Sequence, residues 1–120
     1  MKLAEIATFT DDVVGMATFY RKFLHADPIA ESDGMAIFLV GKTRIFIHQT
    51  YTPTPDELAP EGHIAFEVPD VDAACDALQA RGLVVDIAPR DYYWGRSAYL
   101  RDPSGRLLEL SEARPGESPA

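Results

Sequence analysis

A histidine and a glutamate in the second half of the chain have the chemistry of a metal site. Glu109 stands between Leu108 and Leu110, and a carboxylate among leucines is costly to bury unless it is paired, hydrogen-bonded or metal-bound. Side chains alternate along a strand, so Leu107 and Glu109 are expected on the face away from the helices. His63 begins another strand-like run of the same half. Imidazole and carboxylate both bind zinc, iron, manganese or nickel, so we expect a divalent ion here.

Two residues of the first half are candidates for further ligands. Glu5 matches His63 when residues 5–13 are set over residues 63–71, an alignment in which four of nine places are identical. His48 is expected on the same strand face as Phe46. A site of Glu5, His63 and Glu109, with or without His48, would leave one position open for substrate. The alternatives are a hydrogen-bonded strand histidine at His63 and a solvent-facing charge at Glu5.

An aromatic segment, residues 91–96, is predicted to be a loop before a strand. Tyr93 and Trp94 could stack on a flat ligand, and Arg96 could hold an anion. Tyr51, between the two halves, could add to the same pocket. The alternative is that Trp94 packs as core over the open end of a sheet.

The elements that must position these residues repeat along the chain. In each half a strand precedes an Asp that can cap a helix, Asp12 or Asp70, and further strands follow. The pattern predicts an α+β fold of two tandem βαβββ modules with curved mixed sheets. The expected ranges are helices at 12–25 and 71–81, and later strands at 29–31, 35–40, 43–49, 83–87, 97–100 and 106–110. We expect one domain, with module one at 1–50, a proline-rich linker at 51–62, module two at 63–111 and a flexible tail at 112–120.

Composition excludes several classes of partner. The 120 residues carry a net charge of −8, which argues against nucleic-acid binding. No apolar run approaches the roughly 20 residues that cross a bilayer, so no membrane association is expected. Cys75 is the single cysteine and cannot form an internal disulfide, so the cytoplasm is the expected location.

Three segments of the second half carry a resemblance to a known family. They are residues 63–71, the run Trp94-Gly95-Arg96, and residues 100–110, in which an Asp-Pro-Ser-Gly turn precedes Glu109. These segments resemble the second module of the vicinal-oxygen-chelate superfamily, which contains glyoxalases, bleomycin-resistance proteins and extradiol dioxygenases. Residues 9–13, with the run 19–21 and Leu24, resemble its first module.

The resemblance implies a glyoxalase-like fold and a homodimer. It also implies that His63 and Glu109 are ligands, because metal-using members carry His and Glu at these places. Glu5 stands where such members usually have His or Gln, and Phe46 stands where they have another Glu. Phe46 cannot bind a metal.

Three functions remain open from the sequence. The first is a metal-dependent lyase, isomerase or dioxygenase whose ion acts as a Lewis acid on a small oxygen-bearing substrate, with Glu109 or Glu5 moving a proton. The second is a metal-free protein that sequesters a cationic or planar drug, similar to bleomycin-resistance proteins. The third is a scaffold with a vestigial cavity.

Overall fold

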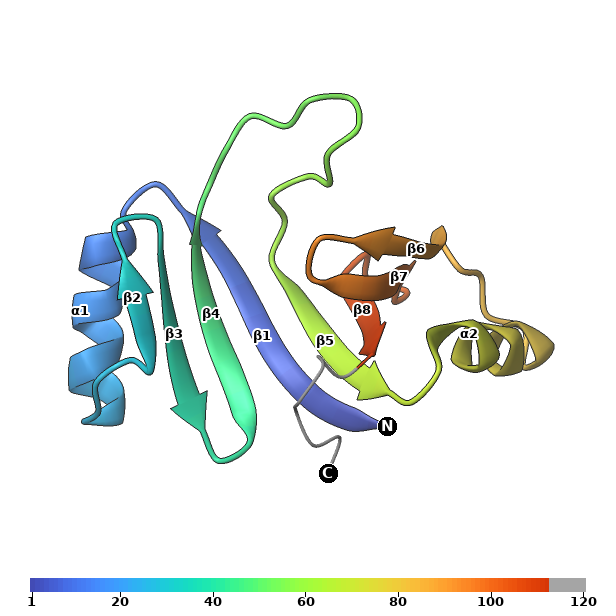
Figure 1. Cartoon of the computed structure of the whole chain (residues 1–120), viewed down its shortest axis with the longest axis horizontal. Helices are drawn as coiled ribbons and strands as arrows, with labels where there is room; N and C mark the ends of the chain where they lie inside the picture. Colours follow the sequence, from blue (N-terminus) through green and yellow to red (C-terminus); the bar gives the residue numbers. More distant parts are fainter. Residues whose placement is uncertain (113–120) are drawn as a thin grey trace. The chain divides into compact units, whose positions relative to one another are not determined.

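The computed structural model describes residues 1–112, which form two compact units with the same order of elements (Figure 1). One unit comprises Glu5–Gly62, and the other comprises Met1–Ala4 and the described chain from His63. The elements of the first module are β1 (Lys2–Thr10), α1 (Val13–Leu24), β2 (Ala30–Ser32), β3 (Met35–Val40) and β4 (Thr43–Gln49). Those of the second are β5 (His63–Val68), α2 (Val71–Ala80), β6 (Ile87–Tyr92), β7 (Gly95–Arg101) and β8 (Leu107–Glu112). The predicted α+β fold of two βαβββ modules is confirmed.

The two modules have the same strand order. In the first it is β2-β3-β4-β1, and in the second it is β6-β7-β8-β5. In each, the first strand runs parallel to the last strand and the other neighbours are antiparallel, so both sheets are mixed. Ala7 pairs with Phe46 in one parallel ladder, and Ala65 pairs with Glu109 in the other. Phe46 therefore occupies in module one the place that Glu109 occupies in module two.

Both helices are capped at their N-termini by the predicted aspartates. A side-chain oxygen of Asp12 accepts a hydrogen bond from the Gly15 amide at 2.9 Å, and one of Asp70 accepts from the Ala73 amide at 3.0 Å. Each bond satisfies an amide that has no partner within its helix. Gly82 follows α2 with a φ of 90°, the left-handed conformation that commonly ends helices.

Each helix packs on one face of its own sheet. In module one the buried side chains of α1 meet Ala36, Phe38 and Ile47. In module two Val71 and Cys75 of α2 meet a cluster from the strands, namely Val68, Ala98, Leu100 and Leu110. Strand alternation then sends the residues between these core positions to the opposite, helix-free face of each sheet. The candidate metal ligands of both modules lie on these helix-free faces.

One predicted strand was misplaced. Residues 83–87 were expected to be extended because of the apolar run Leu83-Val84-Val85, but Val84 is 76% exposed and β6 starts at Ile87. Within the second sheet β6 pairs only with β7, and such an edge strand tolerates Pro89, which cannot donate to a ladder. The register also shifts between Ile87 and Arg90.

Two further boundaries differ from the prediction. The aromatic segment 91–96 is not a loop before a strand, because it forms the hairpin between β6 and β7 with Tyr93 and Trp94 in the turn. Strand β8 extends to Glu112, which had been assigned to the tail. The rest of the predicted tail, residues 113–120, lies outside the described residues. Residues 51–62, the predicted linker, contain no helix or strand.

Neither described helix is long and apolar enough to span a membrane. Cys75 is a free thiol buried against the sheet of module two, and burial raises its pKa above the ordinary value. Its burial makes this cysteine part of the core, and the raised pKa disfavours the reactive thiolate form.

Two phenylalanines provide a matched test of this packing. Phe38 is 1% exposed in the core of module one, whereas Phe23 is 72% exposed on α1. Phe38→Ala should lower the free energy of unfolding by about 3–5 kcal/mol, because it leaves a cavity. Phe23→Ala should change it by less than about 1 kcal/mol. Urea denaturation measures both values, and similar losses for the two variants would contradict the described core.

Candidate metal and ligand site

The helix-free face of module two brings His63 and Glu109 together. The distance from His63 Nε2 to Glu109 Oε1 is 3.0 Å, and their side chains are 14% and 8% exposed. Donors about 2.1 Å from one ion lie about 3.0–3.4 Å apart at ligand angles of about 90–109°. The separation therefore suits two adjacent ligands of one ion, and it equally suits a hydrogen bond.

Glu109 is held from its other oxygen as well. The Ser97 hydroxyl lies 2.7 Å from Glu109 Oε2, and the Trp94 indole nitrogen donates to that hydroxyl at 3.0 Å. Ser97 is fully buried. The carboxylate is thus held by residues of two strands and a hairpin turn.

The β6–β7 hairpin forms an aromatic layer beside this network. Trp94 stacks on Tyr92 with ring centroids 4.5 Å apart and planes at 2°. The Tyr99 ring lies nearly perpendicular to that of Tyr92, with centroids 6.2 Å apart, and Tyr93 is 93% exposed. Burial raises the pKa of the Tyr92 hydroxyl. Trp94 is half-buried, so it has a packed face and an accessible one.

Arg96, predicted to hold an anion, is already paired with two carboxylates. Its guanidinium donates to both oxygens of Asp72, at 2.7 and 3.0 Å, and to Asp91 at 3.0 Å. These contacts tie the hairpin to the start of α2. An anionic ligand would have to compete with them.

The helix-free face of module one carries the other two candidate ligands. Arg44 donates to the Glu5 carboxylate at 3.1 Å across the β1–β4 ladder. The His48 ring lies 5.1 Å from that of Phe9 and 5.4 Å from that of Phe46, with which it is stacked. Glu5 thus has an ionic partner and His48 an aromatic setting. Their coordination of one ion together with His63 and Glu109 stays a prediction.

Tyr51, predicted as a ligand-binding residue, lies beside the same aromatic rings. Its ring centroid is 6.2 Å from that of Phe9 and 6.4 Å from that of His48. Its hydroxyl donates to the Leu58 carbonyl within the 51–62 segment. The residue therefore has a structural role in addition to any contact with a ligand.

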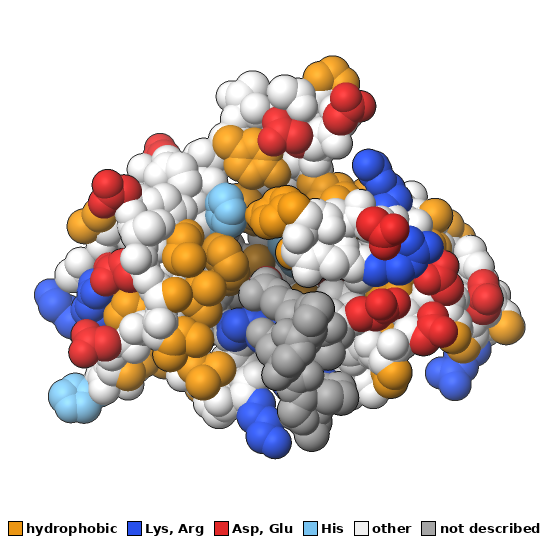
Figure 2. Space-filling view, in the orientation of Figure 1, with side chains coloured by type: hydrophobic (Ala, Val, Ile, Leu, Met, Phe, Trp, Pro, Cys, Tyr) orange, Lys and Arg blue, Asp and Glu red, His pale blue; other side chains and the backbone are white. Residues whose placement is uncertain are grey.

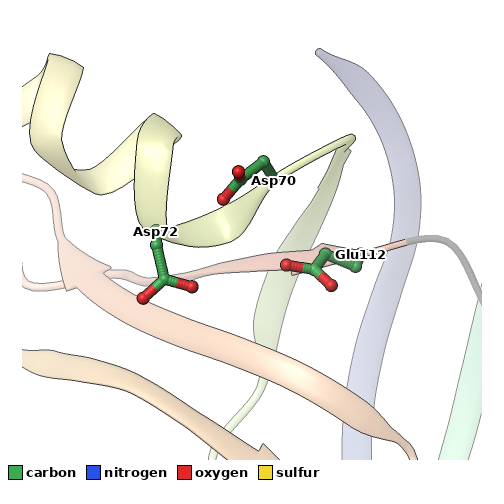
Figure 3. Close-up of side chains that lie close together, drawn as sticks. All are labelled: Asp70, Asp72 and Glu112. Atoms are coloured by element: carbon green, nitrogen blue, oxygen red, sulfur yellow. The ribbon is translucent and has the colours of Figure 1, made fainter.

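The sequence reasoning missed a group of three carboxylates at the start of α2 (Figure 3). Ligand atoms of Asp70, Asp72 and Glu112 all lie within 4.8 Å of one another. Each also has a partner in the fold: Asp70 caps the helix, Glu112 accepts from the Val71 amide at 3.0 Å, and Asp72 binds Arg96. Positive charge at a helix N-terminus favours this arrangement without an ion. Only the cap at Asp70 was signalled by the sequence.

Comparison with known proteins adds an independent result. Residues 2–110 match the family model described as the Glyoxalase/Bleomycin resistance protein/Dioxygenase superfamily. A probable lactoylglutathione lyase of Vibrio cholerae is 39% identical over 51 residues, which are 41% of this chain. The match covers only 37% of the length of that relative.

Solved structures share the fold. A hypothetical protein of Bacillus halodurans superposes with a TM-score of 0.75 at 20% identity, covering 98% of this chain and 97% of that one. A variant of Streptomyces coelicolor methylmalonyl-CoA epimerase, in complex with 2-nitronate-propionyl-CoA, superposes with a TM-score of 0.72 at 24% identity and covers 99% of both chains. These likenesses establish the fold alone.

The Arg96–Asp72 contact predicts a pH effect. The hydrogen bonds from Arg96 hold the Asp72 pKa below its ordinary value of 3.8. A carboxyl whose pKa is lowered by folding stabilises the fold above its unfolded pKa, and this contribution is lost as the pH falls through the folded value. Arg96→Ala should return the Asp72 pKa toward 3.8, measured by carboxyl NMR titration. An unchanged Asp72 pKa in that variant would show that the contact does not form in solution.

Proposed function

The chain belongs to the Glyoxalase/Bleomycin resistance protein/Dioxygenase superfamily, and on that premise we propose that it is a metal-dependent enzyme acting on a small oxygen-bearing molecule. The observation that carries the proposal is the His63–Glu109 pair, two donor side chains 3.0 Å apart and largely shielded from water. A bound zinc, iron, manganese or nickel ion would supply Lewis-acid polarisation of a substrate oxygen.

Each candidate residue has a proposed role that follows from its chemistry. His63 and Glu109 would hold the ion from module two, and Glu5 and His48 are the proposed ligands from module one. The carboxylate that does not hold the ion, Glu5 or Glu109, is the one proposed to move a proton. For Glu5 this requires that its bond to Arg44 opens or is shared, because the carboxylate already accepts the Arg44 hydrogen bond. The relative described as a probable lyase favours lyase chemistry over dioxygenase chemistry.

The second candidate is a metal-free binding protein, and the aromatic hairpin favours it. Tyr93 is almost fully exposed beside the Tyr92–Trp94 stack, a surface suited to a flat ligand. The net charge of −8 would attract a cationic one. In this reading the His63–Glu109 contact is a buried hydrogen bond and needs no ion. The aromatic residues Tyr51, Tyr93 and Trp94, with Arg96, remain the proposed ligand-binding set in both readings.

Metal analysis distinguishes the two candidates. Protein purified without chelators should contain about one divalent ion per chain by mass spectrometry, and His63→Ala or Glu109→Ala should each reduce that content about tenfold or more, because each removes a ligand. Arg96→Ala should keep the ion. His25→Asn is a matched histidine control, since His25 ends α1 at a positive φ of 53° that asparagine tolerates. A wild-type chain without metal, or variants that retain it, would leave the metal-free reading as the better one.

We also propose that the protein acts as a homodimer in the cytoplasm. Apolar side chains remain exposed on the described surface, including Leu39 and Val40 of β3, and Figure 2 shows hydrophobic side chains gathered over the strands of module one. Pairing of two chains would cover this apolar surface. In the proposed dimer, modules of different chains would share a site. Cys75, a buried thiol, is compatible with a reducing compartment.

Light scattering at tens of micromolar measures the oligomeric state. The expected mass is twice the chain mass of 13.2 kDa, with an interface of roughly 1,200–2,000 Å². A monomer at that concentration would refute the dimer and leave the metal site to a single chain.

A further inference from the structure

The Trp94–Ser97–Glu109 hydrogen bonds form a chain with one possible direction. An indole nitrogen can only donate, so Trp94 Nε1 donates to the Ser97 oxygen at 3.0 Å. The single hydroxyl proton of Ser97 is then directed to its other neighbour, Glu109 Oε2, at 2.7 Å. Glu109 Oε2 is therefore an acceptor.

We propose that Ser97 and Trp94 are positioning residues that orient Glu109 for ion binding. The serine hydroxyl engages Oε2, and Oε1 is the oxygen that faces His63 Nε2. The inference rests on the proposed function, because it assigns to these two residues the orientation of a proposed ligand. It differs from the proposals above, in which Trp94 contacts only the substrate.

The surroundings make the orientation rigid. Ser97 lies on β7 with no exposed surface, and Trp94 is clamped by its stack on Tyr92. The hydroxyl therefore has little freedom to turn away from Glu109, and water has no access to replace it. Loss of the hydroxyl would leave Oε2 without its donor, which is unfavourable for a buried carboxylate.

Ser111 provides a matched control. It pairs directly with Ser97 across the β7–β8 ladder and shares its face of the sheet, yet Glu109 takes its hydroxyl donor from Ser97. Ser111→Ala removes the same group as Ser97→Ala from the neighbouring strand. The two variants thus separate the loss of this contact from the loss of a serine.

The first measurement needs no metal. Trp94 is the only tryptophan, so its indole N–H gives a single side-chain NMR resonance. In metal-free protein, Ser97→Ala should shift this resonance and speed its exchange with water, whereas Ser111→Ala should leave it in place. An unaltered resonance in Ser97→Ala would overturn the hydrogen-bond chain regardless of whether the protein binds an ion.

The second measurement is a competition titration of wild type and variants with Zn²⁺. Ser97→Ala should weaken binding roughly 10- to 100-fold, the usual effect of removing a group that orients a ligand. Ser97→Thr, which keeps the hydroxyl, should restore most of the affinity. Trp94→Phe keeps a ring on Tyr92 but loses the N–H, and should weaken binding by a smaller factor.

The outcomes separate this inference from the proposed function. A wild-type protein that binds no Zn²⁺ refutes the metal function and with it the positioning role. A wild-type protein that binds Zn²⁺, with Ser97→Ala binding equally well, refutes the positioning role alone. Equal weakening by Ser97→Ala and Ser111→Ala would show a general disturbance of the sheet and would also overturn it.

Discussion

Glu109 brings a carboxylate into a strand between leucines and leaves it almost without contact with water. Desolvation of a charge costs several kcal/mol unless partners replace the water, and module two supplies those partners from separate elements. His63 at the start of β5 meets one oxygen, and Ser97 of β7 meets the other. The strand order places β8 between β5 and β7, so both partners reach Glu109 from adjacent strands. The hairpin that carries Trp94 completes the arrangement by fixing the serine.

The repeat explains why the modules share a fold and differ in chemistry. Glu5 and His63 occupy equivalent strand positions, as do Phe46 and Glu109. Module one has an ion pair at the first position and an aromatic ring at the second, where module two has an imidazole and a carboxylate. The helix-free face of module one accordingly combines the Glu5–Arg44 pair with the rings around His48. Module two thus carries the two adjacent donors of the proposed metal site, whereas module one presents mainly aromatic side chains on its helix-free face.

The sequence predicted the features that follow from helix capping, side-chain periodicity and the internal repeat. Capping preferences predicted the two aspartates, and periodicity predicted the helix faces and the strands 35–40 and 43–49. Alternation and the internal repeat together predicted that His63 and Glu109 lie close to each other. Strand β6 could not be predicted in place, because the apolar run before it is exposed and its own residues include a proline and charges that only an edge position allows. The Ser97 contact and the pairing of Arg96 with Asp72 were also missed, since they join residues 12 and 24 positions apart and depend on side-chain geometry.

The most direct test of the metal site is the crystal structure of Mn²⁺-loaded protein, with the ion located by anomalous scattering. We expect a peak about 2.0–2.2 Å from His63 Nε2 and Glu109 Oε1, with Ser97 still bonded to Oε2. A peak only at Asp70, Asp72 and Glu112, with the His63–Glu109 hydrogen bond intact, would contradict it.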